Sequence, residues 1–210
     1  YTAALLKTVL SGYDGPVVLD ADALNTLARH KNYFKSLTSH CIMTPHEGEA
    51  ARLLNIPVGE ISENREKSAK IIAEEFSAVC VLKGAGTLVV SAEGELLQNT
   101  TGNPGMATGG SGDVLTGMAA SFAAQFRKGA QQENFKAALA AVYLHGLAGD
   151  LAAAEMGEYG LIAGDIPCYI PYAIKELSEK YNLTFWVRDN LPMDWWFRPC
   201  ATSNPFLSTR

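Results

Sequence analysis

A glycine-rich stretch carries the strongest chemical signal in the sequence. Residues 100–113 (TTGNPGMATGGSGD) contain five glycines and one proline. Glycine loses the most backbone entropy on ordering and proline lacks an N–H donor, so this stretch predicts a loop. Residues 114–120 (VLTGMAA) are typical of the first turns of a buried helix. Loop amides that lead into a helix N-terminus attract phosphate and other anions, so an anion site is expected here.

Asp113 stands at the junction between this loop and the helix. A carboxylate beside a bound anion is repelled by it, so the residue is better suited to take a proton from a reacting group. The alternative is that Asp113 only caps the helix. We favour the base, because a cap requires one residue and not a fourteen-residue glycine loop.

Polar residues also follow two short apolar runs. Asp20 ends the run 16–20, and Asp22 and Asn25 follow it. His46 and Glu49 come after the run 41–44. In open α/β sheets ligands bind at the carboxyl ends of the strands, so these groups are expected to line one edge. Two alternatives stay open: Asp22 caps a helix over 23–29, and His46 is an ordinary surface residue.

Lys83 follows a third apolar run, 78–82, and opens the sequence KGAGT. A lysine in this place can reach a phosphate, while the glycine backbone lies flat against a nucleotide. The alternative is a solvated lysine in a hairpin turn.

These residues must be positioned by alternating strands and helices. Apolar periodicity predicts helices over 1–11, 23–29, 50–54, 62–75, 112–125, 134–154 and 166–180. Strands are expected over 16–20, 41–44 and 78–82, and 87–91 is expected to pair back as a hairpin. This series predicts an α/β fold with a parallel sheet and one functional edge. His145 falls on the alanine-rich face of a long helix and is expected to be a hydrogen-bonded core residue.

Composition limits the class of protein. The 210 residues are 48% hydrophobic and 19% charged, as in one ordinary globular domain. A net charge of −5 argues against nucleic acid as a partner. No apolar run reaches bilayer length, so no membrane is expected. The four cysteines lie far apart, which predicts buried reduced thiols and a cytoplasmic location.

The two ends of the chain call for separate expectations. The first residue is Tyr, so we expect the numbering to begin within a longer polypeptide. Residues 179–210 hold all three tryptophans without periodicity, which predicts an aromatic-rich tail of unknown role.

Two familiar nucleotide-binding motifs are absent, since there is no G-x-x-x-x-G-K-[ST] and no complete dinucleotide fingerprint. Residues 109–112 resemble a nucleophile elbow around Ser111, but Asp113 stands where that motif needs glycine, which argues against a Ser111 hydrolase.

Three segments together carry a family resemblance. Residues 44–49 (TPHEGE), 83–87 (KGAGT) and 102–115 (GNPGMATGGSGDVL) are similar to the ADP/ATP-dependent NAD(P)H-hydrate dehydratase family. That family is a ribokinase-like repair enzyme, often fused to an NAD(P)H-hydrate epimerase domain. The likeness extends over about 12–177 and includes 17–25 (VVLDADALN). It implies a ribokinase-like, mostly parallel sheet flanked by helices over 1–178, N-terminally truncated with the front portion missing.

The resemblance also implies a reaction. A nucleotide, ADP or ATP with Mg²⁺, would phosphorylate the hydroxyl of hydrated NADH or NADPH, and loss of phosphate would regenerate the nicotinamide, which makes the enzyme a carbon–oxygen lyase. Asp113 would be the base, and His46 and Asp113 would contact the substrate. Glu49 would position water around Mg²⁺. The remaining roles are nucleotide binding by Lys83, Gly84, Ala85, Gly86, Thr87 and Gly112, and stabilisation of the migrating phosphoryl by the amides of Gly110, Ser111 and Gly112.

Other functions remain open from the sequence. One is a ribokinase-like kinase of a small molecule such as a vitamin precursor, against which His46 and residues 103–106 (NPGM) argue. Another is an inactive nucleotide-binding fragment. The sequence does not choose between ADP and ATP, and it leaves open a homo-oligomer and a fused or separate epimerase partner.

Overall fold

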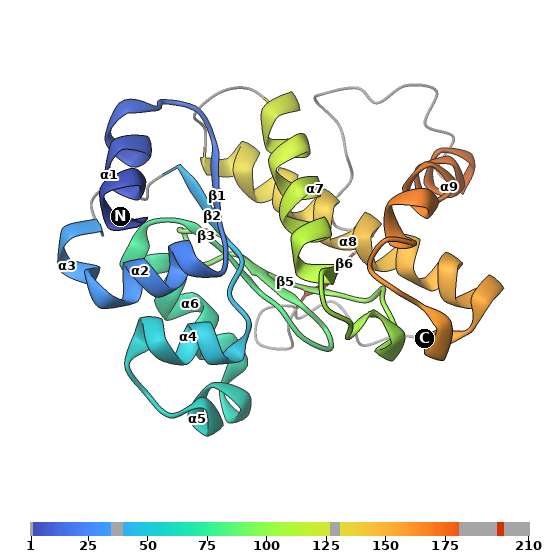
Figure 1. The fold of residues 1–210 in the computed structure, drawn as a ribbon, viewed down its shortest axis with the longest axis horizontal. Helices are drawn as coiled ribbons and strands as arrows, with labels where there is room; N and C mark the ends of the chain where they lie inside the picture. The colour runs from blue at the N-terminus through green and yellow to red at the C-terminus, as the bar shows by residue number, and fades with distance from the viewer. Residues whose placement is uncertain (1, 35–39, 127–130, 181–196, 200–210) are drawn as a thin grey trace, which may run out of the picture.

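The computed structural model describes residues 2–34, 40–126, 131–180 and 197–199 (Figure 1). The helices are α1 (Thr2–Gly12), α2 (Asp22–Arg29), α3 (Lys31–Phe34), α4 (Glu47–Leu54), α5 (Val58–Glu63), α6 (Arg65–Phe76), α7 (Ser111–Gln125), α8 (Gln131–Met156) and α9 (Ile166–Lys180). The strands are β1 (Val17–Leu19), β2 (Cys41–Met43), β3 (Val79–Leu82), β4 (Leu88–Val90), β5 (Leu96–Asn99) and β6 (Phe197–Pro199). Two 3₁₀ turns, η2 (Pro104–Met106) and η3 (Glu158–Gly160), complete the described elements.

The strands form one sheet in the order β1-β2-β3-β4-β5-β6. Helical crossovers join β1, β2 and β3, which are parallel. Tight hairpins join β3, β4 and β5, which therefore pair antiparallel, and β6 also pairs antiparallel with β5. The α/β class is confirmed, as is the hairpin after β3. The expectation of a mostly parallel sheet holds for β1 to β3, and the described sheet as a whole is mixed.

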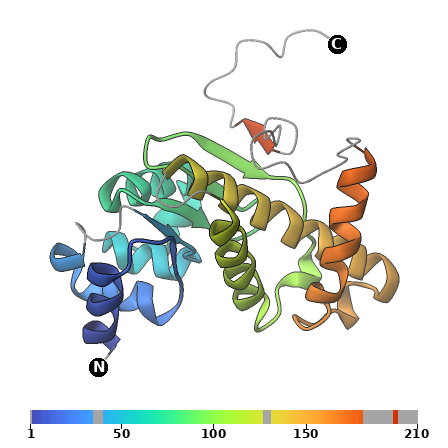
Figure 2. The ribbon, with the colours of Figure 1, turned by 90° about the horizontal axis from the view of Figure 1, so that it is seen from above.

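Helices cover both faces of the sheet (Figures 1 and 2). Strand side chains alternate between the faces, so Met43 and Cys80 join one apolar core with residues of α2, α4 and α6. Ile42 and Val79 join the other core with residues of α7, α8 and α9. The fold is therefore a three-layer arrangement in which the strand ends and the start of α7 are held by two separate cores.

Helix α8 corrects one expectation from the sequence. Its window Gln132–Met156 is long and apolar enough to cross a membrane, whereas no such run was predicted. In the fold 72% of the apolar 18-residue stretch within this range is buried. Alanines 137, 138, 140 and 141 are among its fully buried residues, and small side chains let the helix pack closely on the sheet and on α7. The apolar character of α8 is accounted for by its place in the core.

Several boundaries differ from the predicted ones. The helix expected over 50–54 begins at Glu47, because His46 caps it. The helix expected over 62–75 is divided at Asn64, which ends α5 and precedes α6. Asp22 is not a cap, since α2 begins at Asp22 itself and the preceding residue is Ala21. The short helix α3 was not predicted.

The cysteines follow the prediction in part. Cys41 and Cys80 are buried free thiols, and burial raises the pKa of Cys41 to about 12. Cys168 is also free but exposed, so the expectation of burial is wrong for it. Cys200 and the three tryptophans lie outside the described residues. Within the predicted tail, β6 pairs with β5 and forms one edge of the sheet.

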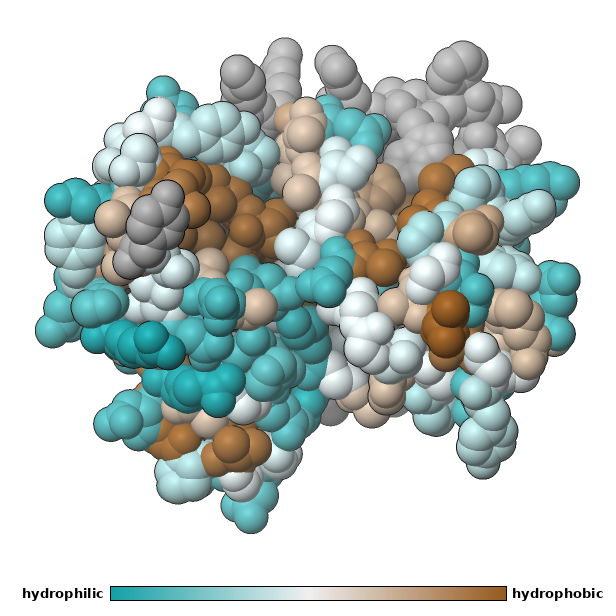
Figure 3. All heavy atoms as spheres, in the orientation of Figure 1, coloured by the Kyte–Doolittle hydropathy of each residue, from teal (hydrophilic) through white to brown (hydrophobic). Residues whose placement is uncertain are grey.

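The opposite edge of the described sheet is β1. Val17 and Val18 are only half-buried there, and Leu5 and Val9 of the neighbouring α1 are exposed. Figure 3 shows an apolar area on this part of the surface.

Candidate functional site

The carboxyl ends of β1, β2 and β3 meet at one edge, as the sequence predicted. The Thr44 amide donates to the carbonyl of Leu19 at 3.0 Å. The Lys83 amide donates to the carbonyl of Pro45 at 2.8 Å. These bonds between the loops that follow the strands bring the predicted residues at the three strand ends to one place.

Lys83 makes the central electrostatic contact of this edge. Its ammonium donates to Asp20 Oδ1 at 2.7 Å and lies 3.9 Å from Glu49 Oε2. The Lys83 side chain is only 19% exposed, so the alternative of a solvated hairpin lysine is wrong. Burial alone would raise the pKa of Asp20, but the hydrogen bond and charge of Lys83 outweigh it and lower that pKa below its usual value.

The same ion pair reaches the start of α7. Asp20 Oδ2 accepts a hydrogen bond from the Thr116 hydroxyl at 2.9 Å. A Cβ built on Gly112 would lie 3.5 Å from the Lys83 ammonium. The lysine and the glycine that were both predicted to hold the nucleotide are therefore neighbours. The pairing of Lys83 with Asp20 was not predicted.

The loop after Lys83 has an open backbone. Gly84 and Gly86 adopt φ values of +147° and +64°, which favour glycine. Thr87 closes the turn by donating from its hydroxyl to the carbonyl of Gly84 at 3.0 Å. Gly84 and Ala85 are exposed, and Gly86 and Thr87 are half-exposed. Their backbone is thus accessible to a flat ligand, as predicted for a nucleotide.

Arg65 contacts the backbone at the start of this loop, and this contact was not predicted from the sequence. Its guanidinium donates to the carbonyl of Leu82 at 3.3 Å and forms an ion pair with Glu47. A Cβ on Gly84 would lie 2.6 Å from the same guanidinium. A charge pattern cannot reveal this contact, because Arg65 is distant from the loop in sequence and lies in a separate helix.

His46 and Glu49 form a capping box at the N-terminus of α4. His46 Nδ1 accepts from the amides of Gly48 and Glu49. The Glu49 carboxylate in turn accepts from the His46 amide at 2.9 Å. Glu49 is buried, while the His46 side chain is 53% exposed. The second ring nitrogen of His46, Nε2, lies 3.5 Å from Glu49 Oε1. Both residues therefore have structural partners, and the exposed half of the His46 side chain is the part that a ligand can reach.

The front of the glycine loop lies directly on α8. Asp150 accepts from the Gly102 amide at 2.8 Å and from the Asn103 side chain at 2.9 Å. A Cβ on Gly146 would lie 2.2 Å from Thr101 Oγ1 and 2.7 Å from its carbonyl carbon. Because Gly146 has no side chain, the loop can approach α8 this closely.

The back of the glycine loop becomes the first turn of α7. Gly110 is the N-cap, with φ +94°. Behind this turn, the buried His145 side chain contacts the Ser111 carbonyl at 3.0 Å, and since a carbonyl only accepts, His145 Nε2 is the donor. The expectation of a satisfied core histidine is confirmed. The Ser111 amide, predicted to face an anion, donates to the Thr108 carbonyl at 3.3 Å.

Asp113 is exposed in the first turn of α7. The alternative of an N-cap is wrong, because Gly110 holds that position. Among the described residues the Asp113 carboxylate has no hydrogen bond or ion pair. The first amides of a helix have no intrahelical acceptor, so Gly112 and Asp113 present N–H groups next to a free carboxylate.

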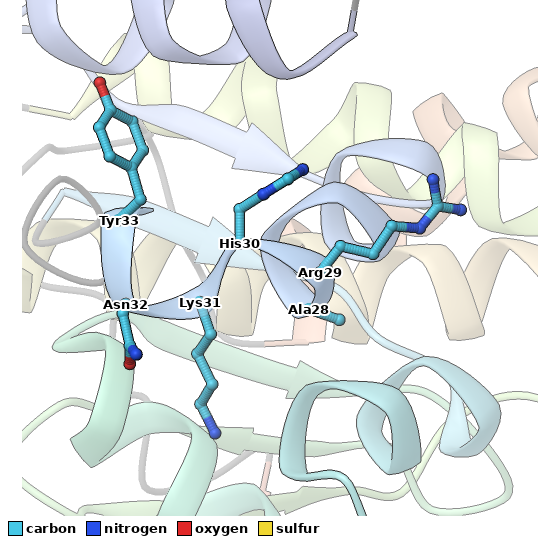
Figure 4. A pocket seen from close by; sticks show the side chains of 6 residues that line it. All are labelled: Ala28, Arg29, His30, Lys31, Asn32 and Tyr33. Carbon is cyan, nitrogen blue, oxygen red and sulfur yellow. The ribbon is translucent and has the colours of Figure 1, made fainter.

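Two other features do not add to this edge. Figure 4 shows a surface depression of about 420 Å³ lined by residues 28–33. It lies at the far end of α2 from Asp20, about 12 Å along the helix. No group of three or more His, Cys, Asp or Glu side chains within the described part of the chain could hold a metal ion.

Comparisons with known proteins agree with this arrangement. Residues 1–172 match the model of NAD(P)H-hydrate dehydratases. The chain is 44% identical over 179 residues to the bifunctional NAD(P)H-hydrate repair enzyme Nnr of Moorella thermoacetica, over 85% of this chain and 33% of that protein. It is 45% identical over 157 residues to the ADP-dependent (S)-NAD(P)H-hydrate dehydratase of Neisseria meningitidis, over 73% of this chain and 51% of that protein.

Solved structures show the same fold. The ADP/ATP-dependent NAD(P)H-hydrate dehydratase of Bacillus subtilis, co-crystallised with ATP/Mg²⁺, gives a TM-score of 0.67 at 32% identity, over 81% of this chain and 58% of that one. A ribokinase-like superfamily protein of Enterococcus faecalis gives 0.67 at 31% identity, over 82% and 58%. The predicted ribokinase-like fold is confirmed. The chain spans between a third and about half of the length of the two sequence relatives.

The contact between the loop and α8 predicts opposite effects for two helical glycines. Gly146→Ala should lower the free energy of unfolding by about 1–3 kcal/mol, because its Cβ would overlap the Thr101 backbone. Gly117→Ala in α7 is the matched control, since nothing lies within 4 Å of its Cβ position. It should raise the free energy of unfolding by up to about 1 kcal/mol through helix propensity. Urea denaturation measures both, and equal effects would contradict the contact.

The buried His145 predicts that the protein loses stability in acid. Burial lowers the pKa of His145 from 6.5 to about 4, against a smaller opposing effect of its bond to Ser111. Between these values the unfolded chain binds a proton at this residue and the folded chain does not, so the free energy of unfolding falls as the pH falls from 6.5 to 4. His145 should contribute about 3 kcal/mol to that fall.

His145→Gln retains a donor for Ser111 and removes the titration. Denaturation of both proteins at a series of pH values should give a shallower acid loss for the variant. Identical slopes would show that His145 is not buried in its neutral form.

Proposed function

The chain belongs to the NAD(P)H-hydrate dehydratase family, and we propose that it carries out the ADP- or ATP-dependent dehydration of hydrated NADH or NADPH. The observation that carries the proposal is local. The exposed carboxylate of Asp113, which has no partner among the described residues, directly follows Gly112, whose backbone lies beside the Lys83 ammonium. A base for an acceptor hydroxyl and donors for a phosphate therefore adjoin each other.

The residues at this edge divide the proposed reaction between them. Lys83 and the open backbone of 84–87 bind the nucleotide, and the Gly112 and Asp113 amides face its terminal phosphoryl group. Asp113 takes the proton of the substrate hydroxyl as its oxygen bonds to the terminal phosphorus of the nucleotide. The bond from that phosphorus to the bridging oxygen breaks, and the nucleotide leaves with one phosphate fewer. The resulting phosphate ester then eliminates phosphate from carbon, together with a proton from the neighbouring ring carbon, which restores the dihydronicotinamide.

We assign the substrate side to His46. Its imidazole is 53% exposed, and the ring is held at Nδ1 by two helix amides and at Nε2 by Glu49 Oε1, which lies 3.5 Å away. A ring held in this way is preorganised to hydrogen-bond a ligand without losing further side-chain entropy.

Magnesium fits this edge only as an ion brought by the nucleotide. The Glu49 carboxylate already accepts from the His46 amide and lies near Lys83, so it is suited to orient a metal-bound water and not to bind the ion directly. Mg²⁺ commonly keeps several waters when phosphates bind it. When bound, it would neutralise charge on the phosphates.

The names of the relatives support both nucleotides. The Neisseria protein is named ADP-dependent, and the Bacillus structure is named ADP/ATP-dependent. The Moorella protein is bifunctional and much longer than the matched part. We therefore propose either nucleotide as the phosphoryl donor and an epimerase domain, fused or separate, as the partner.

The activity is tested by incubating the protein with Mg²⁺, hydrated NADH and either ADP or ATP. Absorbance in the reduced-nicotinamide band should recover only when nucleotide is present. Transfer of phosphate to a vitamin alcohol without recovery would favour a ribokinase-like kinase. Calorimetric binding of nucleotide without any turnover would show an inactive nucleotide-binding protein.

The role of Asp113 is tested by Asp113→Asn. Turnover should fall by a factor of about 10²–10⁴, because the amide cannot take the proton. The ADP dissociation constant should stay nearly unchanged, since the backbone donors remain. Glu66→Gln is the matched control, because Glu66 is an exposed acid in the first turn of another helix, α6. Equal loss of binding and turnover in Asp113→Asn would show a structural role.

A further inference from the structure

Asp20 forms an ion pair with Lys83, but it has no role among the proposed nucleotide-binding and substrate-binding residues. We propose that Asp20 is a positioning residue: it holds the Lys83 ammonium beside Gly112 in the empty site and competes with the incoming phosphate for it. The inference rests on the proposed function, because the phosphate is taken to be that of a nucleotide.

The first step of the argument is that Asp20 is itself firmly held. Its side chain is 11% exposed, and both carboxylate oxygens have partners. Oδ1 accepts from Lys83 at 2.7 Å and Oδ2 from Thr116 at 2.9 Å. A carboxylate fixed from both sides gives a long lysine side chain one preferred position, which a surface pair would not.

The backbone after Asp20 supports the same conclusion. Ala21 has φ 48° and ψ −115°, a conformation that residues with a Cβ rarely adopt. Such strain persists where the surrounding structure dictates it, and it is common at functional sites. Here it turns the chain from β1 into α2, directly after Asp20.

The second step concerns charge. Two carboxylates, Asp20 and Glu49, face the one ammonium of Lys83. The cluster therefore has excess negative charge and opposes an approaching phosphate, although the ammonium attracts it. A phosphate gains the full attraction only as Lys83 turns from Asp20 toward the Gly112 side. Thr116 continues to hydrogen-bond Asp20 through that exchange, so the carboxylate is never left without a partner.

Asp20→Asn separates these effects, because asparagine keeps the shape but not the charge. The ADP dissociation constant should fall about threefold, since the competing charge is lost. Turnover should fall by about tenfold or more, since Lys83 is less well oriented. Both effects should disappear when Asp20→Asn is made in a Lys83→Gln protein, because Asp20 acts through Lys83. Calorimetry and the nicotinamide assay measure the four proteins of this cycle.

Thr116→Val provides a second variant if Asp20→Asn does not fold. It keeps the charge of Asp20 and removes only the bond that fixes it, so turnover should fall without tighter ADP binding. This effect too should vanish in the Lys83→Gln protein.

Two results would overturn the proposal. One is weaker ADP binding in Asp20→Asn together with a lower thermal midpoint, which a purely structural residue would give. The other is an effect of equal size with and without Lys83. Because ADP binding is measured without turnover, a protein that shows the coupling but does not regenerate NADH contradicts only the proposed function. A protein that regenerates NADH without the coupling contradicts only the role of Asp20.

Discussion

The position of the first turn of α7 is the constraint on which the rest of the site depends. Helix amides act on an anion only at the right distance and direction, so this turn must not move relative to the strand ends. Three contacts from different parts of the fold fix it: Thr116 to Asp20 at the end of β1, Ser111 to His145 of α8, and the left-handed Gly110 that starts the helix. The first contact ties the turn to the sheet and the second ties it to a neighbouring helix, so the sheet and the layer of α7, α8 and α9 together hold the turn.

A net charge of −5 is compatible with the anion site that we propose at this turn. A basic surface is unnecessary when backbone donors are aimed at one point and a single lysine stands beside them. Burying that lysine costs solvation free energy, which the adjacent Asp20 offsets. In the proposed mechanism the carboxylate that holds Lys83 before a nucleotide binds is also the group that a phosphate displaces, so folding and binding make opposite demands on Asp20.

Local patterns in the sequence predicted much of the fold and the location of the site. Apolar runs predicted the strands and the long helices, and the glycine loops predicted the edge where Lys83 and the glycine-rich loop meet. The pairing of Lys83 with Asp20, 63 residues away, could not be read from spacing, because it depends on which strands become neighbours. The same reason hides Arg65 beneath Gly84 and Asp150 beneath Gly102. The apolar length of α8 was not predicted, and the fold accounts for it by placing the helix in the core.

His46 and Glu49 show why a motif can have two meanings at once. The His-x-x-Glu spacing places the two side chains one helical turn apart, which suits a capping box as well as a ligand contact. The structural use takes Nδ1 of the imidazole, which accepts from two helix amides, and it places Nε2 3.5 Å from Glu49 Oε1. The cap therefore fixes the ring in one orientation while 53% of the His46 side chain stays exposed. Glu49, buried by the same cap, is brought within 3.9 Å of Lys83, so the helix start that orients the substrate side also contributes to the electrostatics of the phosphate side.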